Sequence, residues 1–136
     1  NKNKDRPINL LQLWIYPNKQ EVTPRYDQIS VCQLKKENEF YQILSPDAKE
    51  AGVWIHQNAW MHLGEFEDNK KQTYTLKKEG NGVYIFMIDG EATIGDYILQ
   101  KRDALGVWET DKMTINPTKG SRILLIEVPM NIETTL

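Results

Sequence analysis

The stretch VYIFMIDGEATIG, residues 83–95, decides the class of fold. Two short runs rich in β-branched and aromatic residues lie on either side of the dipeptide Asp89-Gly90. A dipeptide of this kind suits the positive φ angles of a two-residue hairpin turn. The pattern therefore predicts a β-hairpin between residues 83–88 and residues 91–94.

The first strand of this hairpin has apolar side chains on both faces, because side chains alternate along a strand. One face carries Tyr84, Phe86 and Ile88, and the other carries Val83, Ile85 and Met87. Strands that are apolar on both faces lie in the middle of a sheet. We therefore expect a central strand in which Phe86 is a core residue.

The rest of the chain repeats this pattern of short apolar segments separated by turn residues. Such segments occupy residues 10–17, 29–34, 40–44, 53–57, 60–66, 72–76, 97–100, 104–108, 112–116 and 122–129. None has a sustained apolar period of 3.6 residues, and about ten short strands in one small domain predict a sandwich or a closed barrel. The one helix candidate is SPDAKEAG, residues 45–52, which a turn would explain equally well.

Composition excludes several classes of protein. The 136 residues, 40% of them apolar, suit one domain with a real core. Cys32 is the single cysteine, so no intrachain disulfide can form, and its alternation with polar neighbours suggests a small core side chain. The net charge of −2 with scattered basic residues argues against a nucleic-acid partner. The longest apolar runs are about a third of the length of a membrane span, so we expect no membrane partner.

The opening NKNKDRPIN has neither an initiating Met nor the apolar core of a secretory signal. We therefore expect the chain to be cut from a longer, cytoplasmic protein.

Two longer runs carry a family resemblance. LQLWIYPNKQEVTPRYDQ, residues 11–28, and YQILSPDAKEAGVWIHQNAWMHLGEF, residues 41–66, resemble the C-terminal half of pirin-like proteins of the bacterial quercetin 2,3-dioxygenase type. The resemblance implies an all-β, cupin-type jelly-roll barrel. It makes residues 10–136 the C-terminal cupin of a bicupin, preceded by a polar lead-in at residues 1–9. It also implies that the parent protein has an N-terminal cupin, outside this chain, which binds an iron-type metal. The C-terminal cupin is expected to hold no cofactor.

The cupin metal motifs can be tested by counting. They place imidazole and carboxylate ligands at fixed distances from a glycine and from an asparagine, which we align with Gly90 and Asn116. In the registers tested, the ligand slots fall on Leu76, Lys78, Val83 and Lys112, or on Lys77 and Glu79. The motif is therefore absent.

His56 and His62 are the remaining imidazole donors. They lie six residues apart and would share one face of an unbroken strand. A third ligand would have to be Glu65, which has the opposite parity, or Glu67, which lies beyond Gly64. We expect both histidines to be ordinary barrel or surface residues and keep a metal role as the alternative.

Four aromatic residues are candidates for the lining of a barrel mouth or for the core: Trp54, Trp60, Tyr84 and Trp108. No catalytic constellation is visible. The first hypothesis is a metal-free C-terminal cupin that supports a dioxygenase cupin, its partner in the parent protein. The alternatives are a ligand- or protein-binding β-barrel without catalysis, and an autonomous metal cupin that uses His56 and His62. The predicted strand at residues 10–16 would leave an edge on which the isolated chain could form a homodimer.

Overall fold

The computed structural model describes residues 3–131, and its regular structure there is ten strands and one short 3-10 helix. The strands are β1 (Phe40–Ser45), β2 (Val53–Trp54), β3 (Trp60–Phe66), β4 (Gln72–Thr75), β5 (Asn81–Asp89), β6 (Ala92–Ile94), β7 (Tyr97–Leu99), β8 (Ala104–Val107), β9 (Lys112–Pro117) and β10 (Ser121–Pro129). The helix, η1, is Val31–Gln33. No helix in residues 3–131 is long and apolar enough to cross a membrane.

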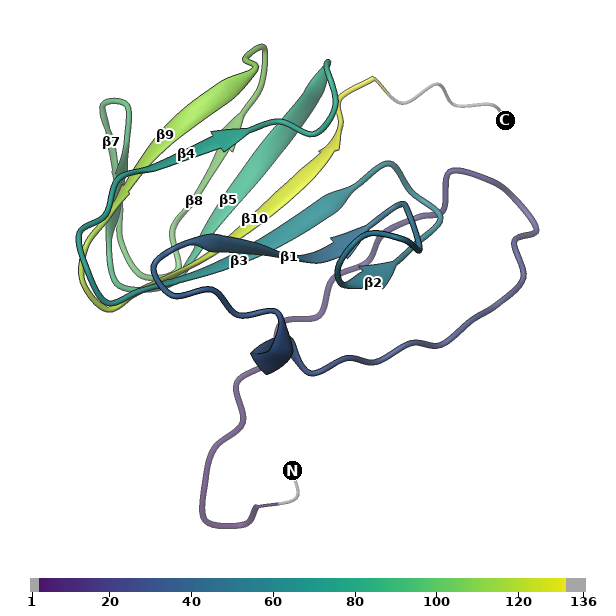
Figure 1. Ribbon diagram of the computed structural model, residues 1–136, viewed down its shortest axis with the longest axis horizontal. Coiled ribbons are helices and arrows are strands. Elements are labelled where there is room, and N and C mark those ends of the chain that lie inside the picture. The colour runs from purple at the N-terminus through teal and green to yellow at the C-terminus, as the bar shows by residue number, and fades with distance from the viewer. Residues whose placement is uncertain (1–2, 132–136) are drawn as a thin grey trace.

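Two sheets face each other (Figure 1). The larger has the order β2-β1-β3-β10-β5-β8 and the smaller the order β4-β9-β6-β7. All pairings are antiparallel except the short β1–β2 pair. The predicted all-β class, with at most one short helix, is confirmed.

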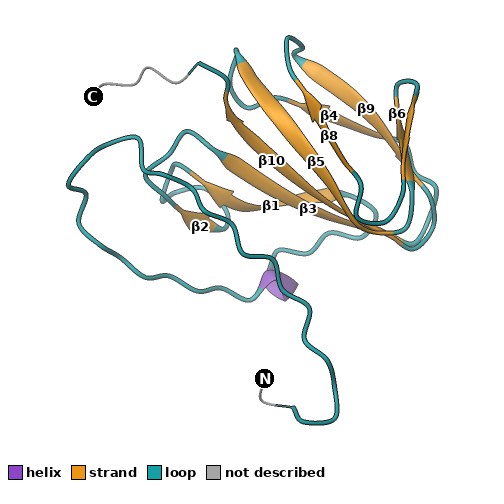
Figure 2. Cartoon of the chain, turned by 180° about the vertical axis from the view of Figure 1, so that it is seen from behind, coloured by secondary structure: helices purple, strands orange, loops and turns teal. Residues whose placement is uncertain are grey.

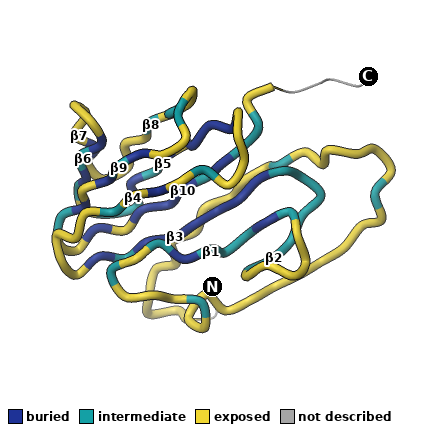
Figure 3. The backbone as a smooth tube through the Cα atoms, turned by 45° about the horizontal axis from the view of Figure 1, so that its top comes forward, coloured by how far each residue is buried: buried dark blue, intermediate teal, exposed yellow. Residues whose placement is uncertain are grey.

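The core lies between the two sheets and is supplied by alternate residues of the facing strands (Figure 3). From β5 it takes Val83, Ile85 and Met87, and from β10 it takes Ile123 and Leu125. Phe66, Tyr74, Ala92, Ile94, Leu99, Met113 and Ile115 complete it.

The predicted hairpin at Asp89-Gly90 is wrong. The chain does turn there, with Gly90 at φ 78°, but β5 pairs with β10 and β8 whereas β6 pairs with β7 and β9. The turn therefore passes the chain from one sheet to the other. A Cβ atom at Gly90 would lie 2.6 Å from the Ser121 hydroxyl oxygen, so close packing against β10 also requires glycine.

The prediction that β5 is central is confirmed, but the assignment of Phe86 to the core is wrong. Phe86 is half-buried on the outer face, where Tyr84 is 47% exposed. The sequence could not distinguish the two faces because both are apolar. The residues that face the second sheet are Val83, Ile85 and Met87, which are almost completely buried.

Residues 3–39 contain no strand, so the strands predicted at residues 10–17 and 29–34 are wrong (Figure 2). Trp14 and Tyr16 are each 82% exposed, and Cys32 is exposed within η1, contrary to its predicted place in the core. Within residues 3–131 no strand pairs with this segment, and an isolated strand has no stability of its own.

A few contacts attach the irregular segment to the larger sheet and its loops. The Asn18 amide donates to the His56 carbonyl at 2.7 Å, and the Lys35 ammonium lies 2.5 Å from the Glu65 carboxylate on β3. The Arg25 guanidinium lies over the Trp54 ring, 4.1 Å from its centroid, and donates to the Trp54 carbonyl. The segment is therefore held by polar anchors, while many of its apolar side chains face solvent.

Two further predicted segments differ from the structure. The segment at residues 53–57 is a strand only over β2, and residues 46–52 form turns rather than a helix. Gly52 explains the tight path there, because it has φ 96° and a Cβ atom would lie 2.3 Å from the Ile43 carbonyl carbon.

Candidate functional site

The most unusual residue of the barrel is Glu127, a carboxylate that is fully buried on β10. Both of its oxygens accept hydrogen bonds. The donors are the backbone amides of Lys77 and Lys78 at 2.9 and 3.0 Å, the side-chain amide of Asn81 at 2.8 Å and the Tyr74 hydroxyl at 2.8 Å. These donors compensate for the cost of removing a carboxylate from water.

The local sequence explains how the donors converge. β4 ends at Thr75, and the chain returns to β5 through a loop in which Gly80 has φ 78°. This loop turns two successive amides inward, and Asn81 opens β5 beside them. Glu127 thus fixes the loop between β4 and β5 to the end of β10.

A histidine extends the network. The Nδ1 atom of His62, on β3, lies 3.3 Å from the Tyr74 hydroxyl oxygen, and the two rings are in edge contact with centroids 5.1 Å apart. Tyr74 has one hydroxyl proton, which it donates to the short contact with Glu127. His62 therefore donates from Nδ1–H to Tyr74, and its Nε2 atom keeps a free lone pair.

The surroundings change the acidity of both rings. Burial, and then the Lys77 ammonium, lowers the pKa of His62 to about 4, so its imidazole is neutral at physiological pH. Burial, together with the Glu127 carboxylate, raises the pKa of Tyr74 well above its ordinary value. The imidazole of His62 and the phenol of Tyr74 are therefore both uncharged at physiological pH.

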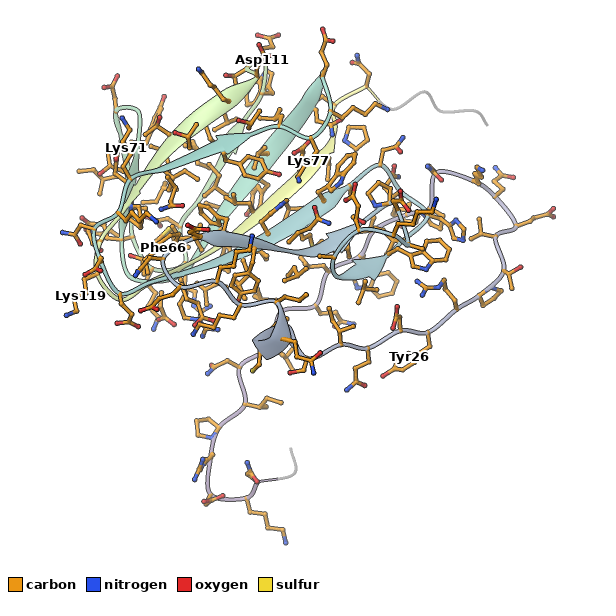
Figure 4. The ribbon with its side chains drawn as sticks, in the orientation of Figure 1. Tyr26, Phe66, Lys71, Lys77, Asp111 and Lys119 are labelled. Atoms are coloured by element: carbon orange, nitrogen blue, oxygen red, sulfur yellow. The ribbon has the colours of Figure 1, made fainter. Side chains whose placement is uncertain are left out.

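His62 and Tyr74 lie at the wall of a cavity of about 440 Å³ between β4 and the strands β1 and β3. Its lining residues are Glu39, Phe40, His62, Lys70, Lys71, Gln72, Thr73, Tyr74, Thr75 and Lys77. Figure 4 shows Lys71 and Lys77 at opposite ends of β4. The cavity is therefore polar, runs beside an edge strand and has more cations than carboxylates in its lining.

The structure does not bring the predicted metal-ligand candidates together. The strand is broken between β2 and β3, so His56 and His62 do not share one continuous face, and the His56 ring lies against Trp54 with centroids 4.8 Å apart. Glu65 contacts Lys35 and Tyr41, and the Glu67 amide donates to Asn38. Among residues 3–131, no group of three or more His, Cys, Asp or Glu side chains could hold a metal ion.

The donor chemistry of the interior also does not fit an iron-type metal. His62 is the one imidazole at the cavity wall, and the nearest carboxylate in its network, Glu127, already accepts from four protein donors. A catalytic metal needs several ligands with lone pairs aimed at one point.

The four candidate aromatic residues do not line one pocket. Trp60 is buried and donates from its indole nitrogen to Glu50 at 3.1 Å. Trp54 contacts Arg25 and His56, while Tyr84 and Trp108 are 47% and 56% exposed. None of them lines the cavity described above.

Sequence reasoning missed Glu127, Tyr74 and Asn81. A signal was present for Glu127, because it continues the inward alternation of Ile123 and Leu125 along β10. Tyr74 and Asn81 carried no comparable signal, since their roles depend on where the loop between β4 and β5 returns.

Comparison with known proteins gives independent evidence for the family to which the chain belongs. A family profile described as the quercetinase C-terminal cupin domain matches residues 42–128. Quercetin 2,3-dioxygenase from Escherichia coli strain K12 is 25% identical over 129 residues, which cover 95% of this chain and 54% of that protein.

Solved structures agree on the fold. YhhW from Escherichia coli has a TM-score of 0.75 at 25% identity, over 85% of this chain and 48% of that one. A quercetin 2,3-dioxygenase from Acinetobacter baumannii has a TM-score of 0.60 at 18% identity, over 70% of this chain and 32% of that one, and shares the fold alone.

The chain spans about half the length of these Escherichia coli relatives. The resemblance to pirin-like proteins and the cupin-type barrel predicted from it are confirmed. The chain belongs to the family of quercetinase C-terminal cupin domains.

Proposed function

We propose that this chain is the supporting, metal-free C-terminal cupin of a bicupin protein, and that an N-terminal cupin in the same protein carries a metal-dependent, quercetinase-like dioxygenase activity. The observation that carries the proposal is the match in length. Nearly all of this chain aligns with little more than half of a quercetin 2,3-dioxygenase. The remaining half of such a protein has the size of a second domain.

The donor set of the barrel supports a role without metal. Glu127 is used to fix a loop, and His62 is fixed through Tyr74. These contacts stabilise the barrel and leave no converging ligand set for oxygen chemistry in residues 3–131.

The irregular N-terminal segment supports a role beside another domain. Leu10, Trp14, Tyr16 and Tyr26 are between 71% and 84% exposed along it. Apolar side chains exposed in this number are typical of a contact surface. We propose that they pack against the N-terminal cupin of the parent protein.

The test compares the chain alone with the longer protein that contains it. After dialysis, metal content is measured by mass spectrometry and quercetin-dependent oxygen uptake with an oxygen electrode. We expect metal and oxygen uptake in the longer protein and neither in the chain alone.

One result would replace this proposal with an autonomous metal cupin. In that case the chain alone would hold one equivalent of metal and consume oxygen with quercetin, and the substitutions His56→Ala and His62→Ala together would abolish both. Lys49→Gln, on a turn outside the cavity lining, is the matched control.

A further inference from the structure

Two cations in the cavity lining, Lys71 and Lys77, have no carboxylate partner among residues 3–131. The Lys70 ammonium lies 3.4 Å from Glu39, but within residues 3–131 neither Lys71 nor Lys77 forms an ion pair. The Glu127 carboxylate lies behind Tyr74 and is occupied by its own donors. The cavity therefore offers positive charge that no described side chain neutralises.

The cavity also offers one directed acceptor. The Nε2 atom of His62 makes no hydrogen bond, and no buried side-chain nitrogen or oxygen in the described part of the chain lacks a partner. Nε2 is therefore not completely enclosed, although His62 as a whole is only 6% exposed, and His62 lines the cavity. Because Nδ1 carries the proton, Nε2 accepts hydrogen bonds from a hydroxyl group.

The wall beside these groups includes an aromatic surface. Phe40 lines the cavity, is half-buried and packs edge-on against Phe66 with centroids 5.2 Å apart. A volume of about 440 Å³ lies within the range of small-molecule sites. The space suits a molecule of moderate size with an apolar part.

We propose that this cavity binds a small organic carboxylate that carries a hydroxyl group, with the carboxylate at Lys77, the hydroxyl donating to Nε2 of His62 and the apolar part against Phe40. This binding site is additional to the supporting role proposed above, and neither depends on the other.

The ligand's two polar groups correspond to two residues of the cavity lining. His62 and Lys77 both line this cavity, and the Lys77 ammonium is the second cause, after burial, of the lowered pKa of His62. Since His62 stays neutral at physiological pH, its Nε2 remains an acceptor there. A 2-hydroxycarboxylate carries one hydroxyl and one negative charge, which is one group for each of these two side chains.

Mandelate is a suitable probe because it combines a 2-hydroxycarboxylate with a phenyl ring. Phenylacetate lacks the hydroxyl, and mandelamide lacks the charge. Affinities are measured by isothermal titration calorimetry at low ionic strength. We expect mandelate to bind about tenfold more tightly than phenylacetate, because its hydroxyl adds one hydrogen bond. We expect no measurable binding of mandelamide. Equal affinity for mandelate and phenylacetate, or no binding of mandelate, would overturn the proposal.

Variants locate the binding. Lys77→Gln should weaken the binding of mandelate about tenfold, because it removes the positive charge. High salt should also weaken binding, because it screens the attraction between the two charges. His62→Leu should remove the preference for mandelate over phenylacetate. Lys49→Gln, on a turn outside the cavity lining, is the matched control and should change nothing.

The Lys77 variant keeps the test decisive if His62→Leu fails to fold. Lys77 is exposed, and its contact with Glu127 uses the backbone amide, which the substitution retains. Unchanged mandelate affinity in Lys77→Gln would show that the carboxylate does not bind here.

Discussion

The Tyr74 hydroxyl donates to the Glu127 carboxylate at 2.8 Å, and this contact joins the two sheets of the barrel. Tyr74 lies on β4 of the smaller sheet, and Glu127 on β10 of the larger. Because both groups are buried, a water molecule cannot take the place of either hydrogen-bond partner unless the barrel opens.

Removal of this hydroxyl should therefore be costly. We expect Tyr74→Phe to lower the free energy of unfolding by about 1.5 to 3 kcal/mol, the usual range for a hydrogen bond to a charged group. Urea denaturation followed by tryptophan fluorescence measures the change. Tyr97→Phe, at a tyrosine that is 63% exposed, should stay within about 0.5 kcal/mol of the parent chain. Equal effects of the two substitutions would contradict the role of the contact.

Stability should fall as the pH decreases from about 6.5 toward 4. The pKa of His62 is about 4 in the folded chain and near its ordinary 6.5 when unfolded. In this window the unfolded chain binds a proton that the folded chain does not, so unfolding becomes easier. The charged or titratable groups around His62 are Tyr74, Lys77 and, through Tyr74, Glu127.

The expected loss between pH 7.5 and pH 5 is about 2 kcal/mol, and it should disappear in His62→Gln. Urea unfolding at the two pH values provides the comparison, with His56→Gln as the control that should keep the pH dependence. A direct check is available by NMR, because the chain has two histidines. An imidazole signal for His62 that titrates near pH 6.5 would show that the ring is not desolvated as described.

Two glycines with positive φ separate steric from conformational effects. A Cβ atom at Gly52 would lie 2.3 Å from the Ile43 carbonyl carbon and oxygen, whereas at Gly80 it would meet nothing within 4 Å. We expect Gly80→Ala to cost about 1 to 2 kcal/mol, from the left-handed backbone alone. Gly52→Ala should cost clearly more, or prevent folding. Equal denaturation midpoints would argue against the close approach of the turn to β1.

The exposed apolar residues at the N-terminal end should make the isolated chain associate. We expect multi-angle light scattering to show dimers that become fewer when Leu10, Trp14 and Tyr16 are replaced with serine, because these side chains are at least 71% exposed. Serine at Tyr97 and Ile98, which are similarly exposed on β7, is the control. A strict monomer at high concentration would contradict this prediction.

Sequence patterns located the strands of the barrel better than their partners. The segments from β1 to β10 were predicted from apolar runs and turn residues, because those signals are local. The Asp89-Gly90 turn was read as a hairpin because its dipeptide suits one. Whether the chain doubles back or crosses to the other sheet is decided by packing against Ser121, which lies 31 residues later.

The strand predicted in the N-terminal segment was wrong for a different reason. Residues 10–17 alternate like a strand, but alternation specifies only which side chains share a face. It does not supply a neighbour with free amides and carbonyls. The candidate site was missed for the same reason: four donors meet Glu127 from β4, β5 and the loop between them, and no spacing in the sequence reveals that meeting.

The position of β10 also bears on how the protein is made. This last strand lies between β3 and β5, so it forms the middle of the larger sheet. During synthesis, β1, β3 and β5 leave the ribosome well before β10. Their apolar faces therefore stay exposed to solvent until β10 has been made. The larger sheet therefore closes only after translation has passed Pro129, and until then the unpaired edges of β3 and β5 favour aggregation.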